Sequence, residues 1–282
     1  MAEIKFTQQE KAKQLYELHY SKKLLVLPNI WDVLGALLLE DVGYPAIATA
    51  SAAVAYTKGY NDGENIPFDD VLHNLKRIAN SVNVPVTADI ESGYAQDEIQ
   101  FEKNIRALIE TGIVGINIED TDKKTKSLLS AEVQCERIKR IKKVSAEMNV
   151  PLFINARTDT FIHAKNFSSP QQQLEETIQR GSAYKDAGAD CFYPILFSKE
   201  ENIKAIVEAV KMPVNILMAP GIPDLNELQA IGVARVSLGP GFLRYAIKAM
   251  KELAIKLQYQ EGLNEVIANE ITSDYFKKLI LR

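Results

Sequence analysis

The sequence predicts a single (β/α)8 barrel, or TIM barrel, of the α/β class. Eight short apolar runs recur along the chain, and most are followed by a segment with helical periodicity. The 282 residues are 46% hydrophobic, which provides enough apolar material for one large core. No interdomain linker or low-complexity segment interrupts the chain, so we expect residues 1–282 to form one domain. A doubly wound open sheet is the alternative, because a sequence does not show whether a sheet closes.

The eight apolar runs are short, continuous and mostly rich in Val or Ile. This composition is typical of parallel strands that are buried on both faces. Proline or glycine precedes several of the runs and marks a turn. The predicted strands are residues 24–28, 45–50, 84–89, 114–119, 151–157, 189–194, 213–218 and 234–239.

Amphipathic segments between the runs predict the helices that surround the barrel. After the second run, one helix face carries Val71, Leu72, Leu75 and Ile78. After the third run, the apolar face is formed by Phe101, Ile105, Leu108 and Ile109. Gly112 ends this second helix and Gly188 ends a later one, since glycine is a common C-terminal signal of helices.

Residues 242–282 are helical in pattern and exceed the single helix that the last barrel unit needs. We expect this segment to pack across the barrel or onto a neighbouring subunit. Its first part is apolar enough to cover a neighbour, with Phe242, Leu243, Tyr245, Ala246, Met250 and Leu253. A homodimer or homotetramer is therefore predicted.

Charge and composition exclude several classes of partner. The net charge is −4 and the pI about 5.6, which argues against nucleic-acid binding. The polar N-terminus lacks the apolar core of a signal peptide, and no run of about 18 apolar residues predicts a membrane span. Cys135, on a predicted helix, and Cys191, in a predicted strand, do not have metal-binding spacing and are expected to be reduced thiols. We expect a cytoplasmic protein.

Acidic residues follow neighbouring predicted strands. Asp89 and Glu91 end the third run, Glu119 and Asp120 end the fourth, and Arg157 and Asp159 end the fifth; Asp62 lies in the loop after the second. The carboxyl ends of barrel strands meet at one rim, so these side chains are expected to lie close together. Asp89 and Glu91 are two positions apart on a continued strand, which would point them the same way.

Clustered carboxylates repel one another unless a positive charge lies among them. Hard oxygen ligands suit Mg²⁺, with Mn²⁺ as an alternative, so the sequence predicts a divalent-metal site. The alternative is that each acid caps a helix or pairs with a lysine. Arg157 is expected to hold a substrate carboxylate by a two-pronged contact, and a structural ion pair is its alternative.

Other motifs narrow the chemistry. No lysine ends a predicted strand, which disfavours a Schiff-base aldolase, and neither GxSxG nor HExxH occurs. The glycine- and proline-containing loops 219–223 and 238–242 are interpreted as turns rather than phosphate sites. The basic run 123–126 is interpreted as a solvated loop that follows the acidic fourth strand and could cover the site.

Longer motifs carry a family resemblance. The segments LPNIWDVLGALLLEDVGYPAIATASAAVAYTKGYNDG, PVTADIESGYA, GINIED and INARTD occur in order between about residues 22 and 255. In these segments the chain resembles the isocitrate lyase and phosphoenolpyruvate mutase superfamily. The resemblance is closest to its smaller phosphonomutase-like, or carboxyvinyl-carboxyphosphonate phosphorylmutase-like, members.

The resemblance implies a barrel whose eighth helix is exchanged between subunits, usually in a tetramer made of two dimers. It implies Mg²⁺ bound directly by Asp89 and through water by Glu91 and Glu119. It also implies that Asp62 lies near metal and substrate, and that Arg157 binds the substrate carboxylate. The segment expected to hold a 2-oxo acid is Thr49, Ala50 and Ser51.

The sequence also departs from the superfamily pattern. The KKCGH loop of the isocitrate-cleaving lyases, with its catalytic cysteine, is absent, so isocitrate cleavage is not expected. In the mutase-like loop, Lys126 replaces the asparagine that assists phosphoryl transfer, and we consider Lys126 a candidate catalytic residue. Ile195 stands where characterised members have an acid or histidine, whereas Asn215 matches a substrate-binding asparagine of the lyases.

These features predict a Mg²⁺-dependent lyase or decarboxylase that cleaves a C–C bond of a small 2-oxo or 2-hydroxy acid through an enolate. A C–P bond enzyme, either a mutase or a phosphonopyruvate hydrolase, is the first alternative. A barrel that binds an oxo acid without turnover is the second, because Lys126 and Ile195 alter the expected site.

Overall fold

The computed structural model describes residues 6–281 and confirms the predicted α/β fold. Each of the eight predicted runs contains a strand, and Pro28, which has no backbone N–H, separates the first strand from a short additional one. The strands are β1 (Leu25–Leu27), β2 (Asn29–Ile30), β3 (Ile47–Thr49), β4 (Val86–Asp89), β5 (Gly115–Glu119), β6 (Phe153–Thr158), β7 (Cys191–Pro194), β8 (Asn215–Leu217) and β9 (Arg235–Ser237).

All strand pairs are parallel, and they form a six-stranded sheet, β2-β3-β4-β5-β6-β7, and a three-stranded sheet, β1-β9-β8. Two links join these sheets into a ring. On one side β1 runs into β2 through Pro28. On the other, a parallel bridge pairs Phe192 with Val214, and the Phe192 N–H donates to the Pro213 carbonyl at 2.8 Å. The strands therefore close as a barrel rather than ending as an open sheet.

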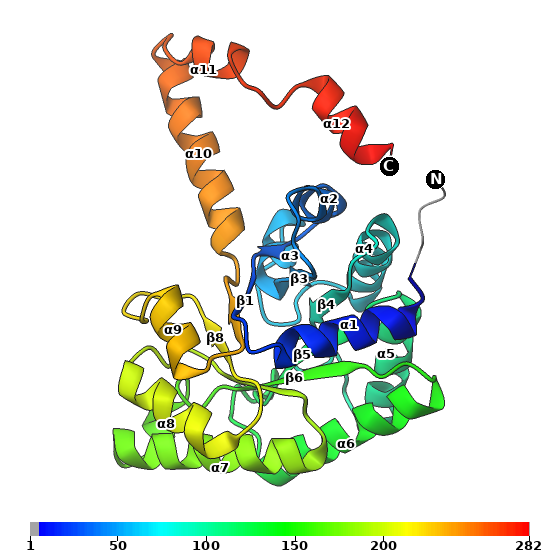
Figure 1. Ribbon diagram of the computed structural model, residues 1–282, viewed down its shortest axis with the longest axis vertical. Helices are drawn as coiled ribbons and strands as arrows, with labels where there is room; N and C mark the ends of the chain where they lie inside the picture. The colour runs from blue at the N-terminus through cyan, green and yellow to red at the C-terminus, as the bar shows by residue number, and fades with distance from the viewer. Residues whose placement is uncertain (1–5, 282) are drawn as a thin grey trace.

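Helices follow the strands and cover the barrel from outside (Figure 1). They are α1 (Gln8–Tyr20), α2 (Val33–Asp41), α3 (Ser51–Thr57), α4 (Phe68–Ser81), α5 (Glu98–Glu110), α6 (Ala131–Glu147), α7 (Pro170–Ala187), α8 (Glu200–Val210), α9 (Leu225–Ile231), α10 (Gly241–Gln258), α11 (Leu263–Ile267) and α12 (Ser273–Ile280). The four predicted apolar residues of α5 are all buried. Of the four predicted in α4, Val71, Leu75 and Ile78 are buried and Leu72 is half-buried. Gly112 and Gly188 follow their helices with φ of 95° and 108°, as predicted.

The amino end of the barrel is covered by α1. Ala12 and Leu15 on this helix join a buried apolar cluster with Leu27, Phe153 and Cys191 near the strand starts. Because this end is filled by apolar side chains, the opposite rim, where the strands end, is the one available for chemistry. Among residues 6–281, no helix is long and apolar enough to cross a membrane.

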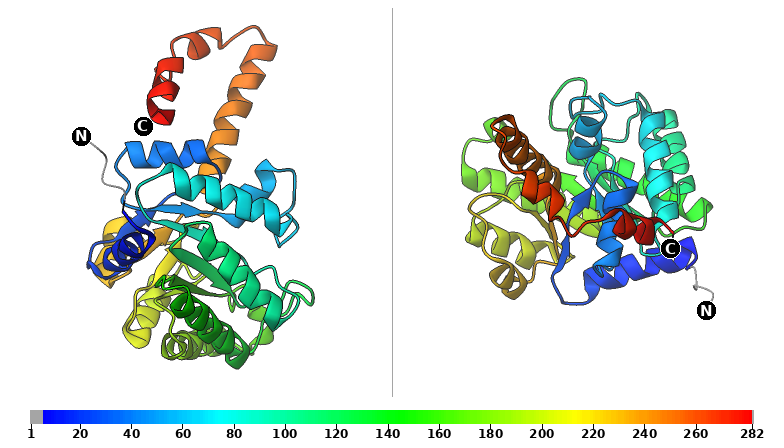
Figure 2. Two further views of the ribbon diagram at one scale, coloured as in Figure 1. Left: turned by 90° about the vertical axis from the view of Figure 1, so that its right-hand side faces the viewer. Right: turned by 90° about the horizontal axis from the view of Figure 1, so that it is seen from above.

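The C-terminal segment extends away from the barrel, as Figure 1 and the left view of Figure 2 show. Along α10 only Leu243 is buried, whereas Tyr245 is 76% and Met250 66% exposed. The chain then returns through α11 and α12, and α12 contacts α2. The helix α10, which follows the last strand, therefore packs little against its own barrel. Residues 1–5 and 282, which belong to the predicted single domain, lie outside the described residues.

Candidate active site

The site begins at the turn after β4. The strand ends at Asp89, and Glu91 follows with a left-handed φ of 51°. The turn is closed by the Gly93 N–H donating to the Ile90 carbonyl at 2.9 Å. Gly93 itself has φ 104°, and a Cβ there would lie 2.6 Å from the Phe101 ring, so only glycine fits. The strand therefore does not continue to Glu91 as predicted, because the chain turns after Asp89.

Asp89, at the end of β4, is held by hydrogen bonds to residues at the start of α3. The Ser51 hydroxyl donates to Asp89 Oδ2 at 3.0 Å and lies 3.4 Å from Asp62 Oδ1, so one hydroxyl links both acids. The Asp89 N–H donates to Thr49 Oγ1 at 3.2 Å. Between these contacts, Ala50 is the N-cap residue of α3. The segment predicted to bind substrate thus adjoins Asp89.

Asp62 lies at the mouth of the site, in the loop before α4. Its surroundings withdraw it partly from water, and the nearby Asp89 adds negative charge. Both effects favour the neutral acid and raise the pKa of Asp62. Asp62 can therefore hold a proton at a higher pH than an ordinary aspartic acid.

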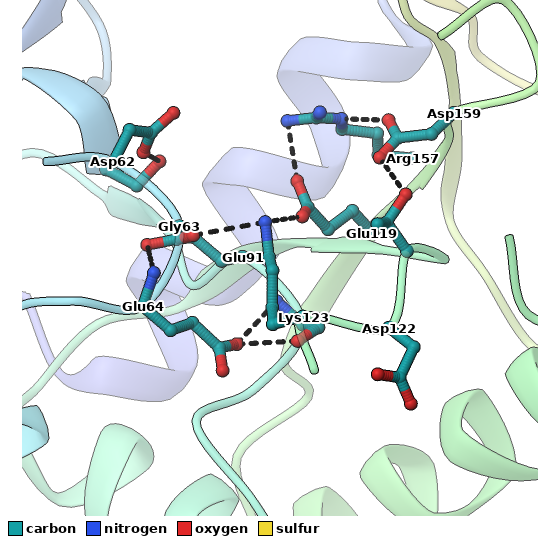
Figure 3. A network of polar contacts seen from close by, with 12 residues as sticks. Asp62, Gly63, Glu64, Glu91, Glu119, Asp122, Lys123, Arg157 and Asp159 are labelled. Atoms are coloured by element: carbon teal, nitrogen blue, oxygen red, sulfur yellow. Dashed lines mark hydrogen bonds and ion pairs between the residues drawn. The ribbon is translucent and has the colours of Figure 1, made fainter. Parts of the chain in front are cut away.

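Glu91 and Glu119 face each other across a lysine, as Figure 3 shows. Both side chains are only 2% exposed. Lys123 Nζ lies 3.1 Å from Glu91 Oε2 and also forms an ion pair with Glu119 Oε1. The Tyr94 hydroxyl and the Glu64 N–H donate to the other oxygen of Glu91, at 3.0 and 2.9 Å. The two acids thus share one cation.

Burial and the charges of the ion-pair partners shift the pKa values of Glu91, Glu119 and Lys123 in opposite directions. Burial raises the pKa of Glu119 to about 8, although Arg157 and Lys123 oppose the shift. Burial also raises the pKa of Glu91, with Lys123 again opposing it. Burial alone would lower the pKa of Lys123, but Glu119 and Glu91 outweigh that effect and raise it. Lys123 is therefore held as a cation between the acids.

Arg157, on β6, is 16% exposed and is engaged by two carboxylates. Nη1 lies 2.7 Å from Glu119 Oε2, and Nε donates to Asp159 Oδ1 at 2.6 Å (Figure 3). The ion pair that was the alternative for this arginine is thus present. Among the described residues, Nη2 forms no ion pair within 4.0 Å, so binding of a substrate carboxylate stays a prediction.

The remaining predicted residues make no ion pair with these acids among the described residues. Asp120 points outward and accepts from the Tyr184 hydroxyl at 2.7 Å and from Arg180 at 3.1 Å, which gives it a structural role. Lys126 is exposed, with Nζ beside the backbone of Gly63. Asn215 is the first residue of β8 and is fully buried, with Oδ1 accepting from Ser237. Their predicted roles in catalysis and substrate binding stay predictions.

Sequence reasoning missed Lys123, Glu64 and Tyr94. The basic run was interpreted as solvated, yet Lys123 points inward. The only sequence signal was that Lys123 follows Glu119 by four positions. Glu64 lies two positions after Asp62, and its carboxylate accepts from the Ser92 and Tyr94 N–H groups, each at 3.0 Å. Glu64 therefore orders the turn that carries Glu91.

The donor atoms fit the predicted divalent cation. Glu91 Oε2 and Glu119 Oε1 are buried and accept no hydrogen bond from the described residues; Lys123 pairs with both oxygens, and Arg157 pairs with the other oxygen of Glu119. Within residues 6–281, no three acidic, histidine or cysteine side chains lie close enough to enclose an ion as they stand. This arrangement suits a hydrated ion with one direct ligand, since Mg²⁺ keeps several waters in proteins.

A family model described as phosphoenolpyruvate phosphomutase matches residues 15–258. The chain belongs to this family. A protein of Mycobacterium tuberculosis H37Rv is 34% identical over 79% of this chain and 81% of its own. The 2,3-dimethylmalate lyase of Eubacterium barkeri is 26% identical over 95% of this chain and 93% of the enzyme. A crystal structure described as a candidate phosphonomutase, from Burkholderia cenocepacia J2315, matches with a TM-score of 0.82 and 34% identity, covering 87% and 99% of the two chains.

These matches confirm the superfamily that the sequence motifs indicated. The matched residues 15–258 include every predicted site residue. The relatives include a 2,3-dimethylmalate lyase and a structure described only as a candidate phosphonomutase, so family membership leaves both C–C and C–P bond cleavage open.

Proposed function

We propose that this protein is a Mg²⁺-dependent lyase that cleaves a C–C bond of a small 2-oxo or 2-hydroxy acid through an enolate. The observation that supports the proposal best is the rim cluster, in which Asp62, Asp89, Glu91 and Glu119 lie beside Arg157 at the ends of neighbouring strands. The lyase activity of the 2,3-dimethylmalate relative supports the same class of reaction.

In this proposal Asp89 is the direct ligand of Mg²⁺, or of Mn²⁺, and Glu91 and Glu119 bind it through water. The metal would supply positive charge that stabilises the enolate oxygen. Arg157 binds the substrate carboxylate, and the Ser51 hydroxyl with neighbouring backbone amides orients the 2-oxo group. Asp62 would hold the proton that is moved, since partial burial and the nearby Asp89 raise its pKa and favour the acid form.

C–P bond cleavage is the second candidate, favoured by the structural match to a candidate phosphonomutase. A turnover panel separates the two. The purified protein with Mg²⁺ is offered substituted malates, oxaloacetate and phosphonopyruvate, and pyruvate, phosphate and phosphoenolpyruvate are measured. We expect pyruvate without phosphate, from a malate or from oxaloacetate. From phosphonopyruvate alone, phosphoenolpyruvate would establish a mutase and pyruvate with phosphate a hydrolase, and no turnover with tight oxalate binding would indicate a binding protein.

We further propose that α10 covers the barrel of a neighbouring subunit, as an exchanged eighth helix. Exposed apolar side chains such as Tyr245 and Met250 would be covered there. We therefore expect a dimer or tetramer in light scattering. A monodisperse particle near 31.5 kDa would contradict this proposal.

We also propose a cytoplasmic location and a small 2-oxo or 2-hydroxy carboxylic acid as the substrate, with neither nucleic acid nor membrane as a partner. Cys135 and Cys191 are unpaired, which is typical of a reducing compartment.

A further inference from the structure

The ion pairs of Lys123 have an unusual setting. Its ammonium contacts two carboxylates that are each only 2% exposed, and the Lys123 side chain itself is 18% exposed. The two oxygens that it contacts accept no hydrogen bond. Buried carboxylate oxygens without such donors are costly unless a cation compensates them. Among the described residues, Lys123 is therefore the cation that pairs with both acids, whereas Arg157 pairs with Glu119 alone.

A compact loop presents this lysine. Asp122 begins the loop, and its carboxylate accepts from the Lys124 and Thr125 N–H groups at 2.8 Å each. A bridge between Thr121 and Leu128 closes the loop at its base. Lys124 and Lys126 are exposed on this loop, so Lys123 alone of its three lysines faces inward. The Asp122 and Lys126 N–H groups donate to backbone carbonyls within the loop, so the Lys123 side chain can move without unfolding a strand or helix.

A second place for the ammonium lies beside the first. A polar cavity of about 270 Å³ is lined by Lys123 together with Glu64, Asp122, Lys124 and Arg137. The carboxylates of Glu64 and Asp122 bring negative charge to this cavity, beside the positive charges of Lys124 and Arg137. A lysine has four rotatable side-chain bonds, so Nζ can leave Glu91 and Glu119 for the cavity while its backbone stays near its present position.

We propose that Lys123 and the divalent cation occupy the Glu91–Glu119 pair alternately, so that metal binding drives the Lys123 side chain into the adjacent cavity. The inference rests on the proposed metal site and adds to it an internal competitor for the metal. Without metal, Lys123 neutralises the acids. With metal bound, two cations at one acid pair would repel each other, and the lysine leaves.

The test compares Mn²⁺ binding to the unchanged protein, Lys123→Met and the control Lys124→Met, measured by the loss of the free Mn²⁺ signal in electron paramagnetic resonance. Removing an internal competitor strengthens binding, so we expect Lys123→Met to bind Mn²⁺ about tenfold or more tightly than the unchanged protein. Lys124→Met keeps the original affinity, because Lys124 is exposed.

Thermal denaturation of the same proteins provides a second readout. Without metal, Lys123→Met should have a lower Tm than Lys124→Met, because two buried acids lose their cation, and Mn²⁺ should remove that difference. Weaker or equal Mn²⁺ binding by Lys123→Met would overturn the exchange while leaving the metal site in place. If none of the three proteins binds Mn²⁺, the proposed metal site is itself wrong. If Lys123→Met does not fold, Lys123→Gln provides the same comparison.

Discussion

Asp89→Ala is expected to abolish Mg²⁺-dependent turnover while the protein stays folded. Loss of an outer-sphere partner of a metal already costs roughly 10–100-fold in affinity or activity, and loss of a direct ligand should cost more. The fold should persist because Asp89 ends β4 and makes no ion pair among the described residues. Its removal also relieves the repulsion that raises the pKa of Asp62.

Thermal stability gives this prediction a readout that does not depend on knowing the substrate. A ligand at about 100 times its Kd stabilises the native state by about 2.7 kcal/mol. Mg²⁺ should therefore raise the Tm of the unchanged protein but not that of Asp89→Ala. Asp69→Ala, which removes an exposed acid from α4, is the matched control and should keep the Mg²⁺ effect. Unchanged turnover in Asp89→Ala would remove the basis of the site assignment.

The barrel could be predicted from sequence because its strands are buried on both faces. Such strands consist almost entirely of apolar residues, so their limits are visible, and the acids that follow them are visible too. Closure was not visible, since it depends on pairing between distant segments such as Phe192 with Val214. Placement of α10 also depends on tertiary contacts, because an amphipathic face does not identify what covers it.

The inner contacts of the site could be predicted less well. A strand pattern continued through Asp89 implied that Glu91 points the same way, but a left-handed backbone at Glu91 turns the chain. Lys123 and Lys126 belong to one basic run, and only the folded loop decides which of them faces inward. Such orientations depend on single backbone dihedral angles, for which residue type gives a weak signal.

Arg157→Lys separates substrate binding from metal binding. Lysine keeps the positive charge beside Glu119 and Asp159 but does not provide two parallel hydrogen bonds to a carboxylate. We expect Mg²⁺ affinity to stay nearly unchanged. Binding of oxalate or pyruvate should weaken by about 1.5–3 kcal/mol, because charge-assisted hydrogen bonds are lost. This corresponds to a roughly ten- to hundredfold rise in Kd.

The ion pairs of Arg157 make a structural role the competing explanation, and Arg180 provides a matched control. Arg180 is also buried, and it pairs with Asp120 and Glu176 on the outer side of the barrel. If both arginines are structural, both lysine variants lose Tm and bind oxalate normally. If Arg157 binds the substrate, only Arg157→Lys loses oxalate affinity in calorimetric titrations with saturating Mg²⁺. Equal oxalate affinity in all three proteins would contradict the carboxylate-binding role, and with it much of the case for a 2-oxo acid substrate.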